Sequence, residues 1–355
     1  MITHLDVETP TAPTPGGHPA FAPAPGYLNA ATLGLPPRAT ADAVRVEVEA
    51  WQRGEACAVA YDAVVNRARA LYAALVGVPS SWVATGSQVS VTAGVLAASL
   101  PAGSRVVCVD GDFSSMVYPF LVQRSLHVRQ VPLEELADAV AEGCDVVAFS
   151  LAQSADGRLV DADAVLDAAR QVGALTFCDL TQAVGWLAVD AADFDVSVCS
   201  AYKWLCSPRG SAFTTVRPEV LERLTPLNAG WYAGESVWGS CYGPQMRLAN
   251  DARRFDVSPA WLSWVGTVPS LELFASLTPD QLGHGAALAD RLRTRLDLAP
   301  QGRPVLSLPD ADGVLARRLG EAGCTVAGRA GLVRIAFHLW NDEADLQQVG
   351  DALSR

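Results

Sequence analysis

The stretch SAYKW at Ser200–Trp204 begins where an apolar run ends, and it carries Lys203 just beyond that run. An earlier apolar run ends at Asp179. An amine can form a Schiff base with an aldehyde, and a carboxylate can keep a pyridine nitrogen protonated. A lysine and an aspartate at neighbouring strand ends therefore predict an enzyme that uses pyridoxal 5'-phosphate.

Short Val-rich runs alternate with helical patterns around this pair. Such alternation is typical of an α/β fold with a mainly parallel central sheet covered on both faces. Ligands in these sheets bind beyond the carboxyl ends of the strands, so Asp179, Lys203 and residues 110–113 are expected on one rim. The expected strands are Arg105–Val109, Asp145–Ser150, Ala174–Asp179 and Val196–Ser200.

The rest of the chain predicts three parts. Residues 1–26 are rich in proline and predict an extended arm, residues 27–250 a large cofactor-binding domain, and residues 251–355 a smaller C-terminal α/β domain. Apolar spacing predicts helices at Ala39–Arg53, Asp62–Leu75, Trp261–Leu277 and Gly283–Leu296, the first capped by Thr40 or by the Pro36-Pro37 pair, with short strands around Thr325 and at Val333–Phe337.

Composition limits the classes of partner. The 355 residues are 50% apolar and 18% charged, with a net charge of -12 that is not gathered into runs, which argues against nucleic-acid and membrane partners and favours a small substrate. The eight cysteines include no Cys-x-x-Cys pair, so we expect reduced thiols and no metal site. No apolar run has the length of a membrane span, and we expect a cytoplasmic protein.

From Tyr27–Ala31 to Arg334–Asn341 the chain resembles the class V aminotransferase group of fold-type I pyridoxal phosphate enzymes, which includes cysteine desulfurases and kynureninase. The resemblance implies that Lys203 forms the Schiff base and then moves the Cα proton. It implies that Asp179 pairs with the pyridinium nitrogen and that Gln182 bonds the phenolic oxygen of the cofactor. The resemblance also implies a homodimer with active sites shared between subunits.

The same resemblance assigns the remaining cofactor contacts. The turn at Gly86, Ser87 and Gln88 is similar to the family's phosphate-binding turn, in which backbone N–H groups face the phosphate. Ser200 and Tyr202 would add hydroxyl contacts to the phosphate, or they are plain strand residues. Phe113 would stack on the cofactor ring, or it is a core side chain at a strand end.

Substrate contacts are expected from both ends of the chain. Arg334 stands where the family places an arginine for the substrate α-carboxylate, a geometry that a guanidinium suits. Asn29 and Ala30 resemble the segment at the pocket mouth, with a simple backbone turn as the alternative. The aromatic side chains of Trp231, Tyr232, Trp238 and Tyr242 either line a mouth for a substrate larger than cysteine or anchor a dimer interface.

Three departures from family patterns narrow the expected activity. Cys324 lies in an apolar strand-like stretch instead of a reactive loop, which argues against a persulfide on the protein. Met116 stands where kynureninase has an acidic residue. Ser258 is the only hydroxyl near the place where many members reach the phosphate of the other subunit.

We therefore expect a lyase that cleaves the C–S bond of an S-substituted cysteine derivative by Cα deprotonation and β-elimination, in sulfur-containing natural-product metabolism. The alternatives with the same cofactor are an aminotransferase, an epimerase and a decarboxylating deaminase of an amino-acid conjugate. The alternative of another class is a catalytically silent binding protein with the same fold.

Overall fold

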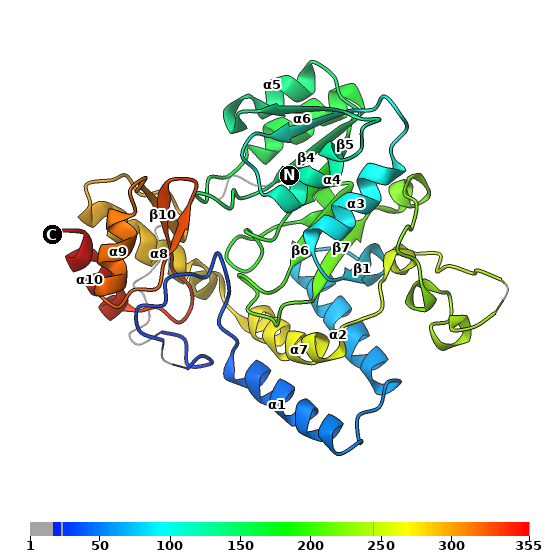
Figure 1. The fold of residues 1–355 in the computed structure, drawn as a ribbon, viewed down its shortest axis with the longest axis horizontal. Coiled ribbons are helices and arrows are strands. Elements are labelled where there is room, and N and C mark those ends of the chain that lie inside the picture. The colour runs from blue at the N-terminus through cyan, green and yellow to red at the C-terminus, as the bar shows by residue number, and fades with distance from the viewer. Residues whose placement is uncertain (1–16, 23, 244, 355) are drawn as a thin grey trace.

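A seven-stranded sheet forms the centre of the molecule in the computed structural model, which describes residues 17–22, 24–243 and 245–354 (Figure 1). Its order is β1-β7-β6-β5-β4-β2-β3. The strands are β1 (Val83–Gly86), β2 (Arg105–Val109), β3 (His127–Val131), β4 (Val146–Ser150), β5 (Leu175–Asp179), β6 (Val196–Ser200) and β7 (Ala212–Val216).

The sheet is mainly parallel, as the alternating pattern predicts. Strands β3, β2, β4, β5 and β6 pair in parallel, and β7 runs antiparallel to both β6 and β1. The four predicted strands are present with at most one residue of difference at their ends. The carboxyl ends of β4, β5 and β6 are neighbours, so the residues after them meet at one rim.

Helices bury both faces of this sheet. Alternate residues of β2 point to opposite sides: Val107 and Val109 join the core beneath α2, α5, α6 and α7, whereas Val106 and Cys108 join the core beneath α3 and α4. The helices are α1 (Arg38–Gln52), α2 (Ala60–Leu75), α3 (Val89–Ser99), α4 (Ser114–Leu121), α5 (Leu136–Ala141), α6 (Ala162–Val172) and α7 (Trp261–Ser276).

A second, antiparallel sheet of three strands lies at the other end of the molecule, with its own apolar core (Figure 1). Its order is β8-β10-β9, and three helices pack around it. These elements are β8 (Val305–Pro309), β9 (Ala327–Arg329), β10 (Leu332–Ala336), α8 (Pro279–Arg295), α9 (Val314–Glu321) and α10 (Glu343–Leu353).

The chain at the end of the predicted arm is attached to the second sheet and its last helix. Asn29 forms a bridge with Ala336 of β10, and Gly26 N donates to the Asp345 carboxylate at 2.6 Å. Of the predicted arm, residues 1–16 and 23 lie outside the described residues. The described part contacts the C-terminal region, because His18 N donates to Leu339 O and Phe21 packs against Trp340.

Helix α7 packs against α1 and α2, which precede the predicted boundary at residue 250. The division into residues 27–250 and 251–355 stays a prediction. The proposed Thr40 cap is wrong: α1 begins after Pro37 without a side-chain cap, and Thr40 Oγ1 donates to Gly266 O of α7 at 3.1 Å. Its hydroxyl thus joins two helices instead of ending one.

No helix among the described residues is long and apolar enough to cross a bilayer.

Candidate active site

Lys203 lies three residues beyond β6 and is buried. The backbone at Gly34 packs directly against the backbone of Tyr202 and Lys203. Gly34 N donates to Tyr202 O at 2.9 Å, and a Cβ at Gly34 would overlap the Lys203 carbonyl. Burial, together with the charges of Arg334 and Arg329, lowers the pKa of Lys203 to about 8, and Asp179 opposes this shift. An amine with this pKa is partly neutral near pH 7, which a base or a Schiff-base nitrogen requires.

Asp179 ends β5 and is buried beside Lys203. Burial raises the pKa of Asp179 to about 6, although hydrogen bonds from Thr181 and the charge of Lys203 lower it. Its carboxylate accepts from Thr181 N at 2.8 Å, and no ion pair within 4 Å joins it to Lys203 or to any other described cation. The carboxylate is therefore mostly ionised at pH 7 and lacks a charged partner, which a protonated pyridine nitrogen would supply.

Phe113 forms one wall beside the lysine. The Lys203 Nζ lies 5.1 Å from the centre of its ring, and the ring is 39% exposed, so it is not a core side chain. Asp112, which sequence reasoning missed, holds this loop in place. Its buried carboxylate accepts from Phe113 N at 2.6 Å, from Ser150 N at 2.8 Å and from Ser150 Oγ at 2.6 Å.

Gln182 lies at the same rim, with its amide engaged by protein groups. Its Nε2 donates to Ala31 O at 3.0 Å and to Ser154 Oγ at 3.1 Å, and its Oε1 accepts from Trp204 Nε1 at 2.7 Å. Both amide protons are thus used within the chain. The predicted bond from Gln182 to the phenolic oxygen stays a prediction.

The predicted phosphate turn joins β1 to α3. Gly86 ends β1, Ser87 follows, and Gln88 precedes the first residue of α3 without a side-chain cap. The first N–H groups of an uncapped helix have no partner within the helix and face outward, which suits a phosphate. Ser200 is buried at the end of β6, and the Tyr202 ring lies 5.7 Å from Lys203 Nζ, so both flank the lysine. Their phosphate contacts stay predictions.

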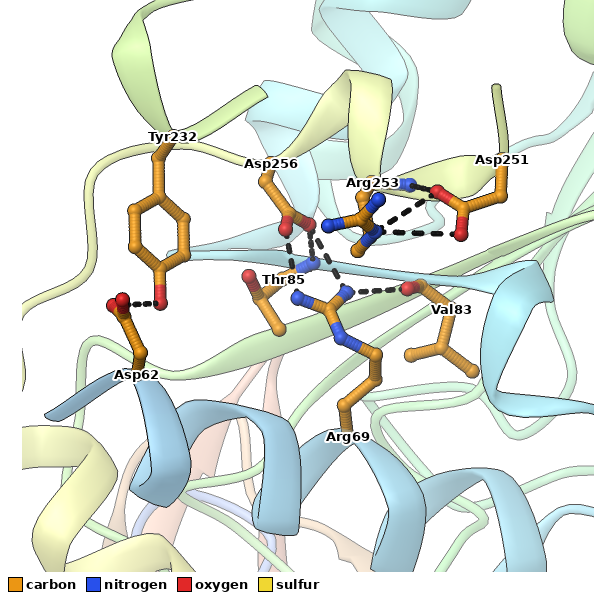
Figure 2. A network of polar contacts seen from close by, with 8 residues as sticks. All are labelled: Asp62, Arg69, Val83, Thr85, Tyr232, Asp251, Arg253 and Asp256. Carbon is orange, nitrogen blue, oxygen red and sulfur yellow. Dashed lines mark hydrogen bonds and ion pairs between the residues drawn. The ribbon is translucent and has the colours of Figure 1, made fainter. Parts of the chain in front are cut away.

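A buried ion pair holds this turn (Figure 2). Arg69 rises from α2 to meet Asp256, with nitrogen–oxygen distances of 2.7 and 3.1 Å. The Asp256 carboxylate also accepts from Thr85 N at 2.7 Å, and Val257 N donates to Thr85 O at 3.1 Å. The segment before Ser258 is therefore fixed to β1. Ser258 itself is exposed, and its contact with a second subunit stays a prediction.

Arg334 lies on β10 and points its guanidinium to the same region. It is 1% exposed, donates from Nη1 to Ser154 O and from Nη2 to Thr32 Oγ1 at 2.7 Å, and has a buried Nε without a partner. Burial lowers the pKa of Arg334 to about 10. No described carboxylate pairs with it within 4 Å, so a carboxylate from a ligand fits the donors it presents.

The other predicted substrate residues lie in different surroundings. Asn29 Oδ1 is buried without a partner, and the Ala30 side chain is fully buried in the main core. Trp231 packs against Tyr232 and Trp238. Within the described part of the chain, none of these three residues forms a hydrogen bond, ion pair or ring contact with Lys203, and their substrate contacts stay predictions.

The aromatic segment is attached to α2. Tyr232 Oη donates to Asp62 at 3.1 Å and Trp238 Nε1 donates to Asp62 at 2.6 Å. Residues 225–243 extend away from the central sheet, and Tyr242 is 95% exposed (Figure 1).

The rim as a whole fits pyridoxal phosphate. It joins a buried amine of lowered pKa, a buried carboxylate without a charged partner, an exposed aromatic face and an uncapped helix start. Sequence reasoning missed Thr32, Ser154 and Asp112, which lie in loops and touch the predicted residues. For Asp112 a signal existed, since an acid immediately before the stacking Phe113 follows an apolar strand.

Comparisons with known proteins agree with this arrangement. The model of the family "Aminotransferase class-V" matches residues 55–311. A kynureninase of Deinococcus radiodurans is 30% identical over 71% of this chain and 66% of its own, and a kynureninase of Salinispora tropica is 29% identical over 81% and 75%. The uncharacterized aminotransferase YcbU of Bacillus subtilis is 27% identical over 58% of this chain. The chain spans 66% of the Deinococcus relative and 57% of the Bacillus relative, less than two thirds of either.

Solved structures share the fold. The cystine C–S lyase C-DES, in complex with cysteine persulfide, has a TM-score of 0.82 at 17% identity, covering 93% of this chain and 97% of its own. The cysteine desulfurase of Thermococcus onnurineus has a TM-score of 0.79 at 17% identity, covering 93% and 94%. The family match, which covers well over half of the sequence, shows that this chain belongs to the class V aminotransferase family.

Proposed function

We propose that this enzyme cleaves the C–S bond of an S-substituted cysteine derivative. Pyridoxal phosphate, when bound, supplies the electron sink that stabilises negative charge at Cα of the substrate. Arg334 holds the α-carboxylate, and Asp179 holds a proton at the pyridine nitrogen. Lys203 Nζ takes the Cα proton, the Cβ–S bond breaks, and both of its electrons leave with sulfur. After hydrolysis the products are a thiol, pyruvate and ammonia.

The observation that carries the choice of a lyase is the burial of Cys324. A desulfurase needs a protein thiolate to accept sulfur, and in this chain burial raises the pKa of the Cys324 thiol. The side chain is 5% exposed and packs in the core of the second sheet. Sulfur therefore leaves with the substrate's own substituent and not as a persulfide on Cys324.

The test is a product assay with S-alkyl cysteines. Equal amounts of pyruvate and thiol, formed without a keto acid, support the lyase. A requirement for a keto acid indicates an aminotransferase instead, racemised substrate without thiol indicates an epimerase, and release of CO₂ indicates a decarboxylating deaminase. Each of these three results refutes the proposal. A natural-product pathway as the source of the substrate is part of the same proposal.

A second candidate is a kynureninase reaction, because two of the relatives carry that name. The Phe113 face beside Lys203 also fits such an enzyme. Against it, Met116 is fully buried, so no acidic side chain stands at the position where kynureninase has one. Incubation with kynurenine and detection of a fluorescent aromatic amine separates the two candidates.

We further propose a homodimer in a reducing, cytoplasmic setting. Tyr242 is 95% exposed on the segment that extends from the sheet, Met246 just after this segment is 80% exposed, and a second subunit would cover such side chains. All eight cysteines are free thiols. Light scattering of the purified protein tests the dimer, and a monomer at micromolar concentration refutes it.

A further inference from the structure

Two arginine side chains meet at one hydroxyl beside the candidate active site. Thr32 Oγ1 accepts from Arg334 Nη2 at 2.7 Å and from Arg329 Nη2 at 3.3 Å. Within the described residues, the other bond of the Arg329 guanidinium goes to the neighbouring carbonyl of Gly328. No carboxylate among the described residues forms an ion pair with either arginine.

The hairpin of β9 and β10 places these two charges together. Arg329 pairs with Leu332 and Arg334 pairs with Ala327, so the two arginines are diagonal neighbours on one face of the hairpin. Ala330 and Gly331, with φ of 48° and 76°, make the tight turn between the strands. Like charges this close destabilise each other, and the charge of Arg329 indeed contributes to the lowered pKa of Arg334. An arrangement of this kind is stabilised when anions bind to it.

The hydroxyl between the arginines is also a free donor. A hydroxyl oxygen has two lone pairs, and in Thr32 both are taken by guanidinium groups, so its proton is left for an acceptor. The same holds for Ser154, whose Oγ accepts from Gln182 and from Arg334 at 3.4 Å. Hydrogen-bond donors thus exceed acceptors at this end of the site.

The two arginines differ in depth. Arg334 is 1% exposed, whereas Arg329 is exposed. A substrate whose α-carboxylate lies on Arg334 would therefore direct its far end toward solvent past Arg329. When the α-carboxylate occupies the buried Arg334, the exposed Arg329 is still available to bind a second anionic group.

We propose that Arg329 is a specificity residue that binds a second anionic group, a carboxylate in the simplest case, on the side chain of the substrate. This rests on the proposed function, in which Arg334 takes the α-carboxylate. The preferred substrates are then cysteine derivatives with an acidic S-substituent, and neutral S-alkyl cysteines are poorer ligands.

Two compounds of nearly equal size test this. S-(2-carboxyethyl)-L-cysteine carries the second carboxylate, and S-(2-carbamoylethyl)-L-cysteine replaces it with a neutral amide. Dissociation constants come from the change in cofactor absorbance when each is titrated into the holoenzyme, and thiol release is measured separately. The variants are Arg329→Gln and, as a matched control, Arg317→Gln, because Arg317 is exposed on α9 with no described side-chain partner.

The unaltered enzyme should bind the acid about tenfold more tightly than the amide, as expected for a charge-assisted hydrogen bond near the surface. Arg329→Gln should reduce this preference to about twofold or less, and Arg317→Gln should keep it. Equal affinity for both compounds in the unaltered enzyme, or equal weakening of both in Arg329→Gln, overturns the proposal. Preferential binding of the acid without thiol release refutes the lyase function and leaves the role of Arg329 standing.

Discussion

Replacing Asp256 by asparagine should destabilise the protein strongly, because it leaves the Arg69 charge buried without a counter-charge. Arg69 and Asp256 are 5% and 2% exposed, and the pair is joined by two hydrogen bonds. Breaking a buried pair from one side costs about 3–5 kcal/mol. With about 2.1 cal/mol/K of unfolding entropy per residue, this corresponds to a fall in Tm of about 4–7 °C for a chain of this length.

Two further variants make the experiment specific. Arg67 lies on the same helix as Arg69 and forms an ion pair with Glu272 of α7. These two side chains are 56% and 48% exposed, so Arg67→Gln should lower the free energy of unfolding by at most about 1 kcal/mol. Burial raises the pKa of Asp256 even though Arg69 opposes the shift, which indicates that desolvation outweighs the attraction. The double variant Arg69→Met/Asp256→Leu should therefore recover part of the lost stability, because it removes the unpaired charge but leaves Thr85 N without its acceptor.

The assay is scanning calorimetry of the holoenzyme variants at one pH and one cofactor concentration. The single variant Asp256→Asn should melt several degrees below Arg67→Gln, and the double variant should melt between Asp256→Asn and the parent. If Asp256→Asn melts within about 1 °C of Arg67→Gln, the buried pair does not hold the phosphate turn in the way described.

Three other outcomes follow from the site. In the apoprotein, ¹³C-methylated Lys203 should titrate near pH 8 by NMR, with the charged form dominant below that pH; a midpoint near 10.5 would show that burial does not act on it. Asp179→Asn should lower kcat at least about 100-fold while cofactor absorbance persists, and a loss below tenfold would argue against its electrostatic role. Gly34→Ala should impair cofactor binding, because its Cβ would overlap the Lys203 carbonyl and lie 3.0 Å from Cys206 Cα. The control Gly94→Ala, whose Cβ points into open space, should leave cofactor binding unchanged. Equal cofactor affinity in the two variants would contradict the close approach at Gly34.

The sequence was sufficient for the parallel centre of the sheet. The strand Val146–Ser150, for example, is buried on both faces, and four of its five residues are apolar, so the sequence shows a nearly continuous apolar run. Strands β1 and β3 were not predicted, for two different reasons. Val83–Gly86 is short and ends in a turn motif, and His127–Val131 is mostly exposed at the sheet edge, so neither shows an apolar run.

The site was predictable where chemistry depends on the residue type and not where it depends on tertiary contact. Lys203 and Asp179 follow strands, and strand order brings them together. Arg329 gave no signal, because its proximity to Arg334 arises from the register of a hairpin. Thr32 is separated from both by some 300 residues of sequence.

The central claim, that Lys203 carries the cofactor, has an unusually direct test because Lys203 is the only lysine in the sequence. The holoenzyme is reduced with borohydride and digested, and the peptides are examined by mass spectrometry. We predict one reduced pyridoxal phosphate adduct per chain, located on Lys203, and none in Lys203→Ala. An adduct on the N-terminal amine instead, or cofactor absorbance of the internal Schiff base that survives in Lys203→Ala, would contradict the account.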